Sequence, residues 1–192
     1  GVRESIDSDV DHLASLLRVS GLLPKHMDMS PLLAEAKSQL HEETDYEQEA
    51  RYLNAFARAL GDDERFLLPR VIPSLSSSRI LGMTFVPGQP IEDVAHADAS
   101  ERNRVAALLF ELFMIELFDL RLVQTDPNFA NYQYNAETGQ IVLLDFGASR
   151  RFKASLVRGY RDLLAGAVAG DRPAMIEAAE SIGYQLGPDN SL

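Results

Sequence analysis

The stretches QTDPNFAN at residues 124–131 and LLDFG at residues 143–147 decide the fold of this chain. In the first stretch Asp126 and Asn131 stand five positions apart, and Asp145 in the second follows Asn131 by fourteen positions. The sequence between them predicts two short strands and a tight turn, over residues 131–134, 141–144 and 135–139 respectively. Because a hairpin brings its two ends together, this pattern predicts that Asn131 and Asp145 lie side by side.

These three side chains suit the chemistry of phosphoryl transfer. Mg2+ takes hard oxygen ligands, usually one or two carboxylates with amide and phosphate oxygens, and a positioned carboxylate can orient a hydroxyl nucleophile. Protein kinases combine D-x-x-x-x-N with a later D-F-G for these tasks. Either motif alone is weak, because Asp and Asn also cap turns, but together at this spacing they are specific. We therefore predict Asp126 as the catalytic-loop acid, and Asn131 and Asp145 as metal and nucleotide ligands.

An acidic stretch, ETDYEQEA at residues 43–50, is the third candidate element. A run of charge on a helix is usually a solvated face, and this interpretation holds for the stretch taken alone. Beside a kinase-like site, however, such a helix supplies the Glu that pairs with the strand Lys that holds the phosphates. Glu43 and Glu49 are both candidates for that role.

A strand is predicted over residues 79–86, ended by Pro87 and Gly88. Taken alone it would be an ordinary edge strand. Next to the motifs above, it stands where a hinge would join two lobes and where backbone groups would read the edge of an adenine. The nucleotide-binding residues predicted there are Met83, Thr84 and Val86.

The rest of the chain has mainly helical patterns, predicted over residues 6–17, 32–60, 105–120, 154–168 and 173–182. Asp171 is the expected N-cap of the last of these helices. The predicted class is therefore mainly α with small β (α+β).

Composition narrows the function further. The net charge of −11 over 192 residues argues against a nucleic-acid partner, and the lack of Cys excludes disulfides and thiolate metal ligands. The most apolar segment, residues 105–122, is interrupted by Glu111, Glu116 and Asp119, which indicates an amphipathic helix of a soluble protein rather than a membrane span.

The three motif stretches together resemble the UbiB family of atypical kinases, also called AarF-domain-containing kinases, which is linked to ubiquinone (coenzyme Q) biosynthesis. Residues 43–50 resemble its E-x-D-Y…E-A signature, residues 124–131 its Q-T-D-P-N-x-x-N loop, and residues 144–150 its D-F-G segment. The resemblance covers nearly the whole chain. It implies a protein-kinase-like fold, with a remnant of the N-terminal lobe over residues 1–86 and the C-terminal lobe over residues 87–192.

The resemblance also implies ATP (or ADP) and Mg2+ as cofactors, and it gives roles to individual residues. Asp126 becomes the catalytic-loop acid, Asn131 and Asp145 become metal ligands, and Glu43 and Glu49 become the acids that face the family's Lys residues. The opening GVRESI at residues 1–6 resembles the segment that follows the family's strand Lys. We therefore expect an N-terminally truncated piece, which alone lacks the nucleotide loop and that Lys.

Two departures from ordinary protein kinases bear on the substrate. Asn128 stands where the catalytic-loop Lys is usual, and no long activation loop follows the D-F-G. That loop is where a peptide substrate normally docks, so its absence argues against a protein substrate. The leading hypothesis is an ATP- and Mg2+-dependent kinase or ATPase that supports ubiquinone biosynthesis, with lipids or ubiquinone-pathway proteins as partners. We expect it in the bacterial cytoplasm, peripheral to the inner membrane, or on the mitochondrial matrix side.

Two other functions stay open on the sequence. One is a small-molecule phosphotransferase of the aminoglycoside or choline kinase type, which also uses an Asp/Asn loop and a later metal-binding Asp. The other is a pseudokinase, a nucleotide-responsive scaffold without chemistry. Replacing Asp145 by Asn would abolish metal-dependent nucleotide binding in the enzymes and leave partner binding intact in the scaffold.

Overall fold

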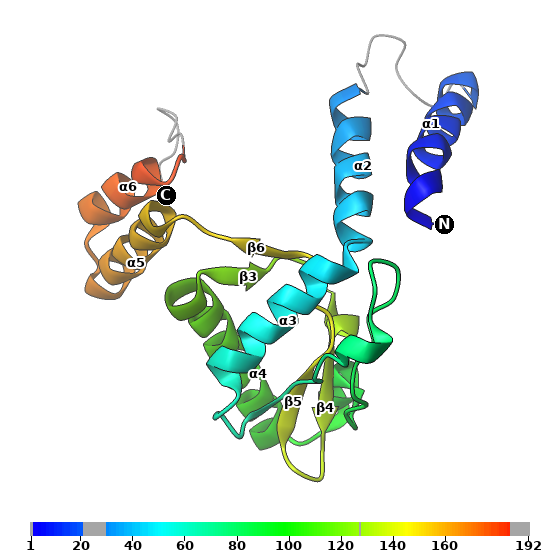
Figure 1. The fold of residues 1–192 in the computed structure, drawn as a ribbon. Helices are drawn as coiled ribbons and strands as arrows, with labels where there is room; N and C mark the ends of the chain where they lie inside the picture. The colour runs from blue at the N-terminus through cyan, green and yellow to red at the C-terminus, as the bar shows by residue number, and fades with distance from the viewer. Residues whose placement is uncertain (1, 21–29, 127, 185–192) are drawn as a thin grey trace.

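The computed structural model describes residues 2–20, 30–126 and 128–184, and most of them are helical (Figure 1). The helices in chain order are α1 (Val2–Ser20), α2 (Ser30–Glu43), α3 (Tyr46–Leu60), α4 (Ala99–Met114), α5 (Ala154–Ala169) and α6 (Arg172–Ser181). Short strands and turns lie between α3 and α5. The predicted α+β class is confirmed.

Two small sheets carry the candidate loops. The larger has the strand order β1-β5-β4-β2, made by β1 (Phe66–Leu67), β2 (Gln89–Pro90), β4 (Tyr132–Asn135) and β5 (Gln140–Leu143). β4 and β5 form the predicted antiparallel hairpin, and β1 runs parallel to β5. The smaller sheet pairs β3 (Leu122–Gln124) with β6 (Ser149–Arg151) in antiparallel fashion and was not predicted. The larger sheet therefore joins the hairpin to strands that precede it, and the smaller sheet joins the chain before the hairpin to the chain after it.

The main hydrophobic core lies between α3, α4 and the larger sheet. Its most deeply buried side chains come from all three elements, and they include Leu53, Phe56, Leu60, Leu112 and Ile141. Phe146 of the D-F-G belongs to the same cluster. One core thus contains residues from both sides of the expected lobe boundary at residue 86, while the division into two lobes itself stays a prediction.

The predicted helix over residues 32–60 is two helices, α2 and α3, with a break at Thr44 and Asp45. Asp45 is the N-cap of α3, and its Oδ1 accepts a hydrogen bond of 2.9 Å from the Gln48 amide. An Asp at this position satisfies one of the free amides at a helix start, so it favours a new helix over a continued one. The same reasoning holds for Asp171, whose Oδ1 accepts from the Ala174 amide and caps α6 as predicted.

The predicted strand over residues 79–86 is wrong. This segment has only two isolated bridges, Val71 with Met83 and Ser77 with Ile80, and the strand that joins the sheet is β2, beyond the expected stop. The physical reason lies in Ser76. Its hydroxyl donates to the Ile72 carbonyl at 2.9 Å and accepts from the Gly82 amide at 3.0 Å. A side chain that satisfies the backbone locally competes with strand pairing.

The predicted helix over residues 105–120 changes its winding near its end. After α4 the chain continues as a π-helical segment, η3 (Ile115–Leu120), and then turns at Arg121, whose φ of 51° is left-handed. Such π-helical turns are rare and occur often at functional sites. The turn leads directly into β3 and so into the loop that carries Asp126.

Two helical pairs lie on opposite sides of this body: α1 packs with α2, and α5 packs with α6 (Figure 1). Between α3 and α4 a short 3-10 helix, η2 (Ile91–His96), lies beside α4. In the described ranges, none of the helices combines the length and the apolar character needed to cross a bilayer.

Candidate active site

A cavity of about 450 Å3 opens where the loop after β3, the loop after β5 and the start of α3 meet. We call it the acid cavity, and its lining consists of Tyr46, Glu49, Asp126, Asn128, Asn131, Asp145, Gly147 and Ala148. Four predicted site residues therefore lie around one space: Glu49, Asp126, Asn131 and Asp145. They come from three separate parts of the chain.

The loop that carries Asp126 and Asn131 is held by its own amide side chains. Asn131 is 7% exposed, and its Nδ2 donates a hydrogen bond of 2.9 Å to Asp126 Oδ2. Asn128 Oδ1 accepts from the Ala130 amide at 3.0 Å and shapes the 3-10 turn η4 (Phe129–Asn131). Because the amide group of Asn131 donates through its nitrogen, its Oδ1 remains the atom of the type that Mg2+ prefers.

The hairpin places Asp145 next to this loop. The Leu144 amide donates to the Asn131 carbonyl at 3.1 Å, which fixes the start of the D-F-G against the end of the loop that carries Asp126. Asp145 itself is exposed, and its Oδ1 accepts from the Gly147 amide at 2.8 Å. A side chain at Gly147 would meet Asp145 Oδ1 at 3.4 Å and Glu49 Oε2 at 3.9 Å. Gly147 thus lies between the two acids.

Phe146 anchors the D-F-G to α3. The ring is 2% exposed and packs on Phe56, with centroids 5.1 Å apart and the planes inclined at 52°. Asp145 faces solvent and Phe146 faces the core, so consecutive residues point in opposite directions. The buried ring fixes the position from which the carboxylate projects.

Glu49 faces Asp145 across the acid cavity. Burial and then the negative charge of Asp145 raise the pKa of Glu49 to about 7, although a hydrogen bond from the Phe146 backbone acts in the opposite direction. Two carboxylates that repel each other favour a cation between them. Within the described residues, no three His, Cys, Asp or Glu side chains gather in metal-binding geometry. The donor set present, Asn131 and Asp145, fits Mg2+, which commonly takes one or two protein oxygens and completes its shell with phosphates and water.

Gln124 and Thr125 were quoted as part of the motif, but no role was predicted for either. The Gln124 side chain connects the two acidic loops: its Oε1 accepts from the Asp126 amide at 3.2 Å, and its Nε2 donates to the Asp145 carbonyl at 3.0 Å. Thr125 donates to the Ala148 carbonyl through its hydroxyl at 2.6 Å. The sequence signal that could have indicated a role for these two residues is their position directly before Asp126.

Glu116 was noted only as an interruption of an apolar segment. It is 4% exposed, and Oε2 accepts a hydrogen bond of 3.1 Å from the Gln124 amide. Burial raises its pKa to about 7. A carboxylate this deeply buried is rare unless it is paired, and sequence periodicity gave no sign that it points inward.

The predicted hinge residues lie outside the acid cavity in the described part of the chain. The Thr84 amide donates to the Arg70 carbonyl at 2.9 Å, and Thr84 Oγ1 accepts from the Arg70 amide at 2.9 Å. The Thr84 amide, which was predicted to read the adenine edge, is therefore already engaged in a hydrogen bond within the protein. Met83 packs against the main core, and Val86 is half-buried. Glu43 ends α2, but its side chain lies outside the described residues.

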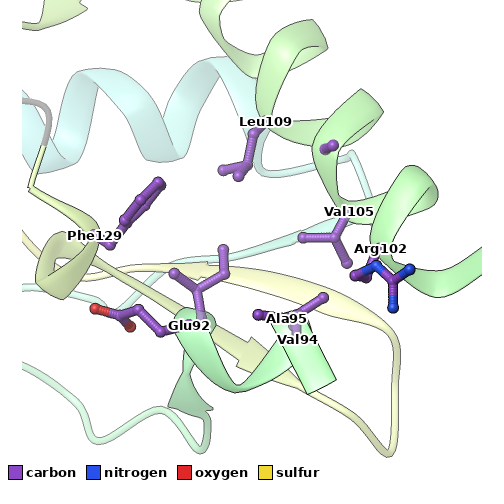
Figure 2. A pocket seen from close by; sticks show the side chains of 9 residues that line it. Glu92, Val94, Ala95, Arg102, Val105, Leu109 and Phe129 are labelled. Carbon is purple, nitrogen blue, oxygen red and sulfur yellow. The ribbon is translucent and has the colours of Figure 1, made fainter. Parts of the chain in front are cut away.

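A second pocket, of about 320 Å3, lies between η2 and α4 (Figure 2). Phe129, from the loop between Asp126 and Asn131, projects into the same space as Leu109 and Val105. The lining is mainly apolar, so this pocket lacks the set of oxygen ligands that the acid cavity offers.

Comparison with known proteins agrees with the motifs and the geometry. Residues 1–179 match the model of a protein family described as "ABC1 atypical kinase-like domain". The chain belongs to this family of atypical kinase-like domains. It is 40% identical over 187 residues to "Atypical kinase COQ8, mitochondrial" of Saccharomyces cerevisiae, a match that covers 97% of this chain and 37% of that protein. It is 38% identical over 196 residues to "Atypical kinase coq-8, mitochondrial" of Caenorhabditis elegans, covering 100% of this chain and 26% of that protein.

The chain thus spans about a third of the length of these curated relatives. A solved structure of a Mycobacterium tuberculosis protein in complex with erythromycin has a similar fold, with a TM-score of 0.71 and 23% identity. That match covers 98% of this chain and 49% of the other. At this identity the likeness concerns the fold alone, and it is consistent with the kinase-like architecture.

Proposed function

We propose that the chain forms the acidic, metal-binding part of an ATP- and Mg2+-dependent atypical kinase or ATPase that supports ubiquinone biosynthesis. The observation that carries this proposal is the meeting of Asp126, Asn131 and Asp145 around one cavity. The family supports the kinase-like class, and the names of the curated relatives support the ubiquinone pathway.

Each side chain has a definite task in this proposal. Asn131 Oδ1 and the Asp145 carboxylate would hold Mg2+, which when bound offsets the negative charge of the nucleotide phosphates. Asp126, fixed by Asn131 Nδ2, would orient the hydroxyl of the acceptor or a water molecule. Glu49 would pair with the Lys that the resemblance implies for this family, and such a partner would relieve the repulsion between Glu49 and Asp145.

The location and the partners are part of the same proposal. The yeast and worm relatives are named as mitochondrial, which favours the mitochondrial matrix side for a eukaryotic protein and the inner face of the inner membrane for a bacterial one. The partners would be lipids or proteins of the ubiquinone pathway. An acceptor of this kind agrees with the short segment between the D-F-G and α5, which leaves little room for a peptide-docking loop.

The test is Mg2+-dependent binding and turnover of ATP by the protein and by Asp145→Asn. Calorimetry should show ATP binding that needs Mg2+ and that weakens roughly 10- to 100-fold in the variant, since a charged ligand contributes about 1.5–3 kcal/mol. Asp93→Asn is the matched control, because Asp93 is exposed on η2 and does not line the acid cavity. Binding that is indifferent to Mg2+ and to Asp145 would overturn the proposal. Binding without hydrolysis or transfer would instead favour a pseudokinase.

A further inference from the structure

Glu116 is a buried acid to which the proposed function gives no task. It lies on the π-helical segment η3 and is 4% exposed. Together with Gln124 it lines a small internal pocket, and two further residues of that pocket, Asn131 and Asp145, also line the acid cavity. Glu116 thus lies directly behind the acid cavity.

A carboxylate in such a place destabilises the fold unless its contacts compensate for the lost solvation. Glu116 makes a specific contact: its Oε2 accepts a hydrogen bond from the amide of Gln124 at 3.1 Å. Burial and then the negative charges of Glu116 and Asp126 raise the pKa of Tyr132 to about 12. Glu116 is therefore close enough to the catalytic loop to influence a side chain that Asp126 also influences.

Gln124 links Glu116 to the two loops that carry Asp126 and Asp145. Its main-chain amide is held by Glu116, and its side chain accepts from the Asp126 amide and donates to the Asp145 carbonyl. One side chain of fixed length thus spans the backbones of the two acids. Where its backbone is fixed, the distance between those two backbones is fixed as well.

We propose that Glu116 is a positioning residue which, through Gln124, sets the separation of Asp126 and Asp145; its importance for turnover rests on the proposed function. Glu116 touches neither substrate nor metal. It acts by fixing the main chain of Gln124 where β3 ends and the catalytic loop begins. The competing explanation is that Glu116 only secures the end of β3 and that the acids keep their places without it.

Amide hydrogen exchange on the ligand-free protein separates these explanations. In Glu116→Leu the acceptor is lost, and we expect exchange at the Asp126 and Gly147 amides to rise at least tenfold, with Ile141 in the core unchanged. Glu116→Gln keeps an acceptor oxygen and should restore most of the protection. Asp119→Asn is the matched control, because it removes a negative charge from an exposed residue of the same segment.

Gln124→Glu gives a second, milder test that does not place an apolar residue at position 116. A carboxylate there can still accept from the Asp126 amide, but it cannot donate to the Asp145 carbonyl. Exchange should rise at Gly147 and stay unchanged at Asp126. If Glu116→Leu exposes only the Gln124 amide, or if Gln124→Glu leaves Gly147 as protected as before, the positioning role is overturned.

Turnover is the second readout. If the protein hydrolyses or transfers phosphate from Mg-ATP, Glu116→Leu should lower kcat tenfold or more and change KM for ATP by less than about threefold, with recovery in Glu116→Gln. A rise in KM together with a fall in kcat and lost thermal stability would indicate a merely structural role. Should the parent protein show no Mg2+-dependent binding at all, the proposed function fails, while the exchange experiment still decides the positioning role.

Discussion

Two segments were predicted to form the nucleotide site: residues 122–151 and residues 70–90. The structure holds them in place by different interactions. In the first, the Gln124 side chain joins the loop after β3 to the backbone of Asp145, and the side chains of Asn128 and Asn131 hold the loop that carries Asp126. In the second, most hydrogen bonds join residues of the segment to each other, and three large apolar side chains, Leu75, Ile80 and Phe85, are 63%, 61% and 89% exposed. The difference teaches that the acidic side of the site is fixed in advance, as electrostatic catalysis requires, while the expected adenine side is not.

The largest effect should come from the anchor of the first segment. Phe146→Ala removes a ring that is 2% exposed and packs on Phe56. We expect a loss of about 3–5 kcal/mol in the free energy of unfolding, because the lost transfer energy and the remaining cavity add. Urea unfolding followed by circular dichroism measures it.

The double variant Phe56→Ala/Phe146→Ala is the control for this anchor. Since the two rings share one contact, their losses should sum to more than the loss of the double variant. Strict additivity would show that the ring contact does not couple α3 to the D-F-G.

A pH effect should be the next largest. Burial raises the pKa of Glu116 to about 7 from an ordinary value of 4.5. The folded state then binds the proton more tightly than the unfolded state, so the stability contribution is present below pH 4.5 and is lost as the pH rises through 7. The shift corresponds to at most about 3 kcal/mol. Glu116→Gln should therefore gain stability relative to the parent between pH 5 and pH 8.

This difference is measured by urea unfolding at pH 5 and at pH 8, with midpoints compared for the parent, Glu116→Gln and Asp119→Asn. The exposed Asp119 serves as the reference, and its variant should follow the parent. A constant gap between the parent and Glu116→Gln across this pH range would contradict the buried titration.

The place where the two segments meet should show an intermediate effect. β2 pairs with β4, and a Cβ at Gly88 would lie 2.7 Å from the Cβ and from Oε1 of Gln133. Gly88→Ala therefore forces a displacement, for which we expect a loss of about 1–3 kcal/mol. Gly170→Ala is not a suitable control, because its φ of 67° adds backbone strain; Gly88→Ala/Gln133→Ala is better, since it relieves part of the clash. Equal stability of Gly88→Ala and the parent would show that β2 can move freely.

Sequence reasoning succeeded where the deciding interactions are close along the chain. Asn131 and Asp145 are joined by one tight hairpin, so their spacing alone predicts that they meet, and Asp171 caps the helix that directly follows it. It failed over residues 79–86, because the hydroxyl of Ser76 replaces strand pairing with a local turn. β propensity is only a weak preference that such contacts override.

It also missed the support behind the acids. The direction of Glu116 depends on the π-helical turn, and a periodicity of 3.6 residues assigns no inward face to an acid there. The bridging role of Gln124 depends on β3 lying against β6, a pairing of two three-residue strands that leaves almost no pattern in the sequence. The ligands of a site can thus be predicted from a motif, whereas the residues that position them follow from tertiary packing.

The smallest effect on stability should come from Phe85→Ala, which is the counterpart of Phe146→Ala in the second segment. With 89% of Phe85 exposed, the substitution removes little buried surface, and the free energy of unfolding should change by no more than about 0.5 kcal/mol. Isothermal urea unfolding beside Phe146→Ala makes the comparison direct, since both variants delete the same ring. If Phe85→Ala costs more than about 1 kcal/mol, the second segment is packed in solution, and the contrast between a fixed acidic side and an open adenine side does not hold.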